Sequence, residues 1–540
     1  MKTQEQKNPP LRRADKITKK RISSKYLLFI AFLSGFTIMA VEIVASRLLT
    51  PYFGSSLFVW TNIIGLIMVF LSAGYYFGGK LADKNPDEYL ILKIISVASL
   101  FIFFIPFFTE PIIRIVSFNF LIVKYASLVI IIGSFLTTFV LFITPITLLG
   151  AVSPFIIKIL SNREKNKEGT KSGLVFAHST FGSIFGTYLT SLVAIPLIGT
   201  NNTIYIAAAI LLFFTLPLIV KKKWILGVVL FFIVSVLIFS FIDSKKVHGK
   251  TIFKDESIYQ NIKIVEEDET YYLKLGADNA YSSLYKENLS ISDGYFDYFS
   301  IAPYVDYTDK QKEILILGLA GGTMVHQYNN LLSKEFDFQI DGVEIDKKLT
   351  SIVQDKFNLQ YDNLNIYNSD GRIFLRQNEK KYDIIIIDAF SKQLYIPAHL
   401  VTREFFQSLP QHLSDSGVLA VNVVAFSSDS KLLKAITNTL ASEFENVYIA
   451  SSQYSYNYFV LASTTEIDFS KISNDISNPL LKNLSLSIES SVQKVDFKPD
   501  ELILSDDKAP LEYLTDRMAF EYLRSKQSAF SADPPRRRTK

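Results

Sequence analysis

The sequence has no cysteine, which excludes disulfide bonds, thiol catalysis and metal sites built from cysteine. It has only five histidines, which are too widely scattered to give the short spacings of a zinc-binding helix. We therefore predict no metal site. Long apolar runs, by contrast, are common, and hydrophobic residues make up 49% of the 540 residues. This share is high for a soluble protein and low for one that lies entirely in lipid, so we expect a membrane part and a soluble part.

A basic N-terminal arm, residues 1–25, precedes the first apolar run and contains nine Lys and Arg against two acidic residues. Such an arm can bind nucleic acid, but its position directly before an apolar run is typical of a membrane anchor. We therefore expect contact with the lipid bilayer and none with nucleic acid. The run that follows lacks a small-residue cleavage site, which favours a retained helix over a signal peptide.

Residues 26–243 are predicted to form a transmembrane domain of about seven helices, and six to eight fit the pattern. One crossing needs roughly 20 apolar residues. Stretches near that length lie at 26–49, 56–79, 89–108, 126–160, 174–198, 203–220 and 223–243. The fourth stretch is too long for one straight crossing and contains Pro145 and Pro154, which predicts a broken helix or a re-entrant hairpin.

Two features inside the apolar runs bear on helix packing. Glu42 lies in the first run, and because an acid is costly in lipid it is expected to face the bundle interior and pair with a base. It would serve there either as a relay for protons or cations or as a structural tie between helices. Gly182 and Gly186 belong to a small-residue pattern that predicts a close approach of two helices.

The composition changes after residue 243 to shorter, more polar segments. Residues 251–305 predict a small β subdomain of short strands. Residues 306–465 alternate strand and helix, which predicts an α/β, doubly wound parallel sheet of the Rossmann-like, class I methyltransferase type. Residues 466–540 are interpreted as a C-terminal extension with a basic tail.

Glycines or acids follow four successive predicted strands. Glycines at a strand-to-helix turn let the backbone approach a ligand, and an acid after the second strand can accept hydrogen bonds from ribose hydroxyls. An acid after the third strand can accept from an adenine amine. Acids used only as helix caps are the alternative for the whole set. In chain order the positions are Gly318, Gly321 and Gly322, then Glu344, then Asp370 with Gly371, and finally Asp388.

The order of these residues distinguishes between nucleoside ligands. A dinucleotide site uses the spacing G-x-G-x-x-G to hold a pyrophosphate on the helix N-terminus. The glycine turn here departs from that spacing and is followed by three acids, which fits an adenosine with a small charged tail. This pattern favours a sulfonium nucleoside over NAD, and group transfer over hydride transfer.

From Asp255 to about Ser463 the sequence resembles the spermidine synthase (polyamine aminopropyltransferase) family. The motifs that carry the resemblance are Tyr259-Gln260, a tyrosine (Tyr295) eight residues before Pro303, and the runs GLAGGT, VEID, SDG and IIIIDAF. The membrane half, with VEIVASRLLTPYFGSSLFVWT and HSTFGSIFGTYL, resembles the membrane regions of fused multi-pass members of that family.

The resemblance implies a reaction and a set of roles. Decarboxylated S-adenosylmethionine would be the co-substrate, a polyamine or other amine the acceptor, and 5′-methylthioadenosine the by-product. Asp388 would be the catalytic residue that takes a proton from the attacking amine, which agrees with the need to deprotonate an ammonium before it attacks. The remaining assignments are the nucleoside ligands Glu344 and Asp370, the amine-site residues Gln260 and Tyr295, and either Tyr454 or Tyr456 as a later family tyrosine.

Three positions depart from the family pattern. Ala320 and Ser391 stand where the family has an aspartate, and Phe296 stands where a Gln or His is common. Loss of a partner for a buried ammonium costs roughly 2–5 kcal/mol. These departures make putrescine less favoured within the expected class of putrescine and related polyamines, and a larger or more apolar acceptor fits a pocket lined by Phe296, Phe390 and Tyr395.

Two alternatives to aminopropyl transfer stay open from the sequence. Ala320 makes room for a carboxylate, which fits a methyltransferase that uses S-adenosylmethionine. The missing anchors also fit a transporter or sensor whose soluble part binds a ligand without turnover. The oligomeric state is equally open, with a homodimer as one option.

Two arguments from the sequence place the soluble part on opposite sides of the membrane. Seven crossings place the basic loops in the cytoplasm but put residues 244–540 outside. A nucleoside co-substrate and the basic tail favour the cytoplasm for the soluble part. We interpret the chain as a multi-pass protein of the cell membrane and, on the chemistry, expect the soluble part in the cytoplasm.

Overall fold

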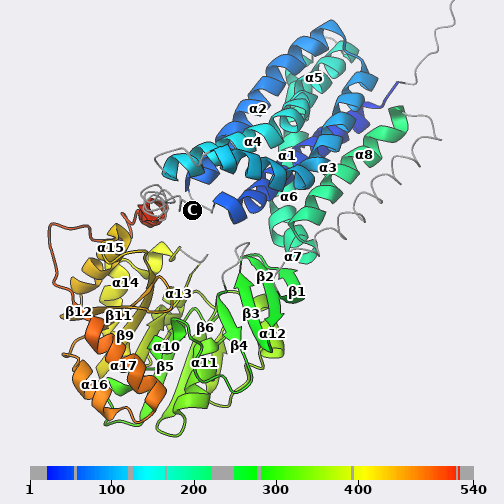
Figure 1. Ribbon diagram of the computed structural model, residues 1–540. Coiled ribbons are helices and arrows are strands. Elements are labelled where there is room, and N and C mark those ends of the chain that lie inside the picture. Colours follow the sequence, from blue (N-terminus) through cyan, green and yellow to red (C-terminus); the bar gives the residue numbers. More distant parts are fainter. Residues whose placement is uncertain are drawn as a thin grey trace, which may run out of the picture.

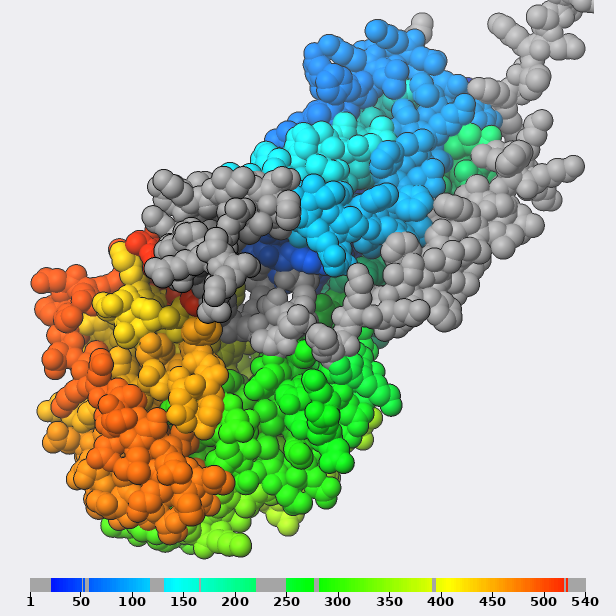
Figure 2. Space-filling model, in the orientation of Figure 1, coloured from blue at the N-terminus to red at the C-terminus, as the bar shows by residue number. Residues whose placement is uncertain are grey.

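The computed structural model describes residues 21–53, 57–119, 126–164, 167–219, 249–275, 281–390, 395–518 and 521–522. These residues form a helical half and an α/β half, which lie at opposite ends of the molecule (Figure 1; Figure 2). Most of the basic arm, the apolar stretch 223–243, Ser391 and the basic tail lie outside the described residues.

Within the described part of the chain, six helices are long and apolar enough to cross a membrane. The seventh predicted stretch, 223–243, lies outside these residues. The helices are α1 (Ser24–Phe53), α2 (Leu57–Lys84), α3 (Glu88–Asn119), the pair α4 (Ala126–Gly150) and α5 (Val152–Arg163), α6 (Glu168–Leu189) continuing to α7 (Ile195–Ile198), and α8 (Thr200–Ile219).

The stretch expected at 126–160 is divided between α4 and α5 at Ala151. α2 packs along both of these helices. A Cβ on Gly74 would lie 2.3 Å from a carbonyl oxygen of α4, and one on Gly78 would lie 2.5 Å from the Cα of Ala151. Because α4 and α5 follow the same partner in succession, the stretch is a broken helix and not a re-entrant hairpin.

The close helix approach predicted at Gly182 and Gly186 is confirmed. A Cβ on Gly182 would lie 1.9 Å from the carbonyl oxygen of Phe32, and one on Gly186 would lie 2.3 Å from that of Phe36. Only glycine therefore lets α6 pack this closely on α1. Glu42 is 9% exposed on α1 and lies inside the bundle, as its cost in lipid predicts, but within the described residues it forms no ion pair with the base that was expected beside it.

The bundle has a basic end and an end that contacts the soluble half. Arg163 forms an ion pair with Glu88 and donates to the Oγ of Ser24 (2.8 Å), so the starts of α1 and α3 meet the end of α5. Lys84 in the last turn of α2 and Lys167 in the loop after α5 also belong to this end. At the other end, the side chain of Arg47 donates to the carbonyl of Ile258. The soluble half thus contacts the bundle at the end away from the basic loops.

The soluble half begins with an antiparallel sheet in the order β1–β2–β3–β4. β1 and β2 form a hairpin with the turn 257–260, and β1 contacts α7 (Figure 1). The strands are β1 (Lys250–Glu256), β2 (Asn261–Glu267), β3 (Thr270–Leu275) and β4 (Ser283–Tyr285).

An eight-stranded sheet follows in the order β12–β10–β11–β9–β8–β5–β6–β7. Its central strands are parallel, which confirms the doubly wound α/β prediction, but β10, β11 and β12 form an antiparallel edge that the sequence did not reveal. The strands are β5 (Gln311–Leu317), β6 (Asp337–Val343), β7 (Leu364–Tyr367), β8 (Tyr382–Ile387), β9 (Leu413–Val424), β10 (Asn446–Ser451), β11 (Asn457–Ser463) and β12 (Gln493–Lys494).

Both faces of the central strands are buried, which explains their continuous apolar runs. Ile314 and Ile316 of β5 pack in the core on one face, and Leu315 and Leu317 pack in the core on the other. The helices that begin directly after β6 and β7 are α12 (Lys347–Lys356) and α13 (Gly371–Gln377). This arrangement brings the residues after β5, β6, β7 and β8 to one edge of the sheet.

Candidate active site

A cavity of about 550 Å³ lies at the carboxyl ends of β5, β6 and β8, where open α/β sheets bind their ligands. Its walls also include the β1–β2 turn and the start of the short helix α10 (Phe296–Phe299). Two of the residues predicted for the site, Gly321 and Tyr454, are not among its described lining. The predicted residues that do line it are Gly318, Gly322, Glu344, Asp370, Gly371, Asp388, Gln260, Tyr295 and Tyr456.

Asp388 is the carboxylate at the end of β8, and two side chains donate hydrogen bonds to it. Tyr295 Oη donates to Oδ2 (3.0 Å), and Asn422 Nδ2 donates to Oδ1 (2.7 Å). Asn457 Nδ2 in turn donates to Asn422 Oδ1 (2.8 Å). Burial raises the pKa of Asp388 to about 7, while the hydrogen bonds from Asn422 and Tyr295 act to lower it. A carboxylate of this pKa exchanges a proton readily near neutral pH.

Asn422 and Asn457 were missed by the sequence reading. Asn422 is 3% exposed on β9, and both residues line the cavity. The signal was a lone amide in the otherwise apolar run VLAVNVVAF, because a buried amide in a strand needs a partner. Which partner it finds depends on β9 lying beside β8 and β11.

Glu344 connects β6 to the glycine turn after β5. Its Oε2 accepts from the backbone N–H of Ala320 and its Oε1 from that of Asp346, both at 3.0 Å. Glu344 is 7% exposed, and burial raises its pKa against the opposing effect of these hydrogen bonds. The backbone contacts hold the carboxylate at the cavity wall.

Asp370 is both a helix cap and a wall of the cavity. Its Oδ1 accepts from the N–H groups of Arg372 and Ile373 at the start of α13, each at 3.0 Å. Its Oδ2 lies 2.7 Å from Nε2 of His399, which also lines the cavity. Asp370 is therefore a helix cap, as the alternative interpretation of the acids predicted, and it also lines the cavity.

The glycine turn divides into positions that need glycine for different reasons. Gly318 has φ +93°, and a Cβ there would lie 2.5 Å from the carbonyl oxygen of Asp388. Gly322 also has a positive φ, +72°, and begins the following helix. Gly321 instead packs on Ser283, whose Oγ accepts its N–H at 2.9 Å. Ser283 itself lines the cavity, and the cofactor-binding role of Gly321 stays a prediction.

The structure distinguishes Tyr454 from Tyr456, between which the sequence could not choose. Tyr456 lines the cavity, whereas the ring of Tyr454 packs edge-on against Tyr298 with centroids 6.4 Å apart. Phe296 and Phe390 line the cavity as expected. Tyr395, predicted as a third aromatic wall, instead donates a hydrogen bond to Asp516 and is not among the described lining.

The cavity is acidic. Three carboxylates line it, and no Lys or Arg occurs among its described lining residues. This charge suits a cationic ligand and is unfavourable for a ligand carboxylate, which needs a cationic or strong donor partner when desolvated. No group of three His, Cys, Asp or Glu that could hold a metal ion occurs in the described ranges.

Comparisons with known proteins point to one family. A family model described as "Spermine/spermidine synthase domain" matches residues 299–471. The polyamine aminopropyltransferase of Vibrio vulnificus is 32% identical over 225 residues, which cover 40% of this chain and 73% of that protein. The chain belongs to the polyamine aminopropyltransferase family. Its fold, with apolar helices before the α/β half, agrees with the fused membrane members that the sequence resembles.

Other aminopropyltransferases align over different shares of the chain. A probable polyamine aminopropyl transferase of Bifidobacterium longum is 29% identical over 195 residues, 36% of this chain and 42% of that protein. Polyamine aminopropyltransferase 2 of Aquifex aeolicus is 22% identical over 405 residues, 72% of this chain and 76% of that protein. A solved probable spermidine synthase from Corynebacterium glutamicum is 17% identical with a TM-score of 0.39, covering 49% of this chain and 99% of that one.

Proposed function

We propose that this protein is a membrane-bound, spermidine synthase-like transferase. It moves an aminopropyl group from decarboxylated S-adenosylmethionine to an amine and releases 5′-methylthioadenosine. The observation that carries this proposal is Asp388, a carboxylate with a pKa of about 7 at the carboxyl end of β8, held between Tyr295 and Asn422. Membership of the aminopropyltransferase family supports the same reaction.

The residues present fit the proposed nucleoside. Glu344 accepts from the ribose hydroxyls and Asp370 from the adenine amine, while Gly318 and Gly322 let the backbone approach the ligand. Because the described lining holds three carboxylates and no Lys or Arg, it favours a ligand that carries a cation and no carboxylate. This supports decarboxylated S-adenosylmethionine over S-adenosylmethionine, and aminopropyl transfer over methyl transfer.

The transfer needs one proton to move. The acceptor amine is protonated at neutral pH, and Asp388 takes a proton from it. The free nitrogen then attacks the carbon next to the sulfonium, so that an N–C bond forms and a C–S bond breaks. Sulfur keeps the electron pair and leaves as a neutral thioether, 5′-methylthioadenosine. Asn422 and Tyr295 hold the carboxylate in place for this step.

The acceptor is putrescine or a related amine, bound between Gln260, Tyr295 and Tyr456. Ala320 and Phe296 lack the polar groups found at these positions elsewhere in the family, and both line the cavity. Aromatic faces bind ammonium groups by cation–π contacts, which offset part of this loss.

The side of the membrane on which the soluble half lies determines where it meets its substrates. The basic loops lie at the end of the bundle away from the soluble half, and the positive-inside rule places that end in the cytoplasm. This opposes the cytoplasmic placement of the soluble half that was expected from the co-substrate. Long domains obey charge rules weakly, so the two orientations need a direct test.

The proposed reaction is tested with the purified full-length protein, decarboxylated S-adenosylmethionine and putrescine. Formation of 5′-methylthioadenosine and spermidine is followed by chromatography. The Asp388→Asn variant should lose about 100-fold or more of the activity, because general-base catalysis contributes 10²–10⁴-fold. Nucleoside binding without product, in the presence of putrescine and longer amines, would contradict the proposal.

A further inference from the structure

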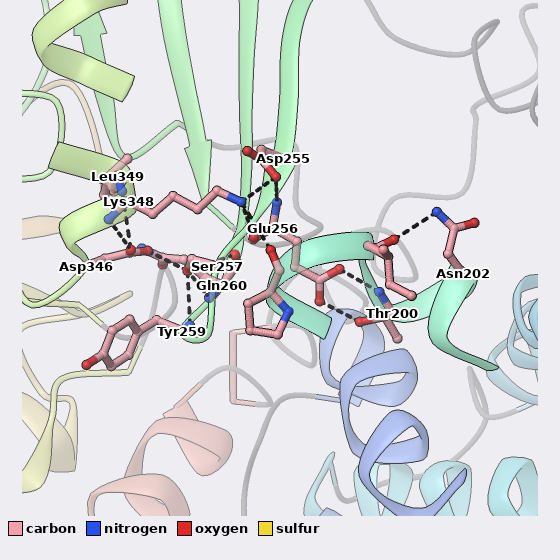
Figure 3. A network of polar contacts seen from close by, with 12 residues as sticks. Thr200, Asn202, Asp255, Glu256, Ser257, Tyr259, Gln260, Asp346, Lys348 and Leu349 are labelled. Carbon is pink, nitrogen blue, oxygen red and sulfur yellow. Dashed lines mark hydrogen bonds and ion pairs between the residues drawn. The ribbon is translucent and has the colours of Figure 1, made fainter. Parts of the chain in front are cut away.

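The turn between β1 and β2 lies beside the membrane helices (Figure 3). Tyr259 and Gln260 of this turn line the cavity. Ser257 begins the turn and is 2% exposed. Its N–H donates to the carbonyl of Gln260 (2.9 Å), and its Oγ accepts from the N–H groups of Tyr259 (3.0 Å) and Gln260 (3.1 Å). One buried serine therefore sets the shape of the turn.

The same serine joins the turn to the nucleoside side of the cavity. Its Oγ donates to Oδ2 of Asp346 (2.6 Å), which is 1% exposed. Asp346 caps α12 through its other oxygen, and its N–H donates to Glu344 Oε1 (3.0 Å). The two walls of the cavity, at Gln260 and at Glu344, are thus linked through two buried side chains.

The membrane helices hold this linked unit from the other side. Glu256, directly before Ser257, accepts from the N–H of Thr200 (2.9 Å) and from its Oγ1 at the start of α8 (Figure 3). A carboxylate is favoured there because a helix N-terminus has unpaired N–H groups. Arg47 of α1 donates to the carbonyl of Ile258 at the tip of the turn.

A lysine completes the junction. Lys348 of α12 donates through Nζ to Asp255 Oδ1 (2.7 Å), to the Glu256 carbonyl (2.8 Å) and to the Pro196 carbonyl of α7 (3.4 Å). The contacts at the junction therefore join three units: the membrane helices, the β1–β2 turn and the segment after β6. Each contact is directional, so the turn has a defined position relative to both neighbours.

We propose that Thr200 of the membrane half and Ser257 of the turn are positioning residues for aminopropyl transfer. This inference rests on the proposed function. Thr200 fixes Glu256 and with it the wall that carries Tyr259 and Gln260, and Ser257 fixes that wall relative to Glu344. Reaction rates are sensitive to misplacement of substrates by about 1 Å. The membrane half is then a part of the catalytic unit and not only an anchor.

The test uses the full-length protein in lipid nanodiscs, with decarboxylated S-adenosylmethionine and the amine that it accepts. Thr200→Val removes the hydroxyl donor at nearly constant volume, and Thr200→Ser keeps it. Thr203→Val is the matched control, because the Thr203 hydroxyl donates to the carbonyl of Gly199, directly before α8, and not to Glu256. KM and kcat for the amine and the dissociation constant of 5′-methylthioadenosine are measured for each protein.

Thr200→Val should raise the KM for the amine about 5-fold, the effect of about 1 kcal/mol from one lost hydrogen bond, and change kcat less than about 2-fold. Thr200→Ser and Thr203→Val should match the wild type. Ser257→Ala should weaken binding of both the amine and 5′-methylthioadenosine, because it separates the two walls.

The outcomes are distinguishable. An active wild type with an unchanged amine KM in Thr200→Val, or an equal change in Thr203→Val, overturns the positioning role alone. A wild type that forms no 5′-methylthioadenosine with any amine overturns the proposed function and the positioning role together.

Discussion

Asn422 on β9 donates a hydrogen bond to Asp388 at the end of the neighbouring strand β8, with 2.7 Å between Nδ2 and Oδ1. The bond favours the ionised form of the carboxyl and partly offsets the effect of burial on its pKa. It also fixes the direction in which the other carboxylate oxygen faces the cavity. This relationship gives the first prediction.

Asn422→Leu should shift the pH dependence of the reaction to higher pH. Asp388 must be ionised to accept a proton, so kcat/KM rises with pH through its pKa of about 7. Removing a hydrogen bond to the ionised form raises that pKa further, and kcat/KM at pH 7 should fall about 10-fold. Asn457→Leu, one step further from the carboxylate, should shift the profile less. If the pH profile of kcat/KM were the same for Asn422→Leu and the wild type, Asn422 would not be setting the pKa of Asp388.

Asp388→Asn should make the protein more stable at pH 8. The pKa of Asp388 is raised from its ordinary value to about 7, so the folded state favours the protonated acid. Burying the ionised form costs stability above the unfolded pKa of about 4, and the cost grows until about pH 7. We expect a gain of ~2 kcal/mol at pH 8 that disappears below about pH 4. Denaturation midpoints across this pH range measure the gain in stability. A gain that does not depend on pH would show that burial of the ionised Asp388 is not its cause.

Tyr456→Leu should weaken binding of the amine, whereas Tyr454→Leu should not. Tyr456 lines the cavity and Tyr454 packs outside its described lining. Loss of an aromatic face for an ammonium costs about 1 kcal/mol, so the KM for the amine should rise about 5-fold in Tyr456→Leu. The pair tests the position of the ring within one short loop. A larger effect at Tyr454 would mean that the amine binds on the other side of this loop.

The orientation in the membrane can be measured directly because the chain has no cysteine. Single cysteines are introduced at Lys471, exposed in the soluble half, and at Asn85, exposed at the basic end of the bundle. Under the positive-inside rule, a membrane-impermeant maleimide should label Lys471→Cys in intact cells and leave Asn85→Cys unlabelled. The reverse pattern would place the soluble half in the cytoplasm, despite the charge of the loops.

The sequence was sufficient to locate the site within its sheet. The run Tyr382–Ile387 is continuously apolar because both of its faces are buried, and the acid that follows it must lie at the carboxyl edge. The same reasoning placed Glu344 and Asp370 in the cavity wall. It did not predict the contact of Gly321 with Ser283, because that contact depends on a strand far away in the sequence that packs against the turn.

What the sequence determined by itself is local: the lengths of the apolar runs, the alternation of strand and helix, and the acids at the strand ends. Each of these depends on neighbours along the chain. Only the tertiary structure decided which distant segments meet. Asn422 and Asp388 meet because β9 lies beside β8, and Thr200 meets Glu256 because the β1–β2 hairpin contacts the apolar helices. Strand order and the docking of the two halves depend on packing over the whole molecule, which no local pattern records.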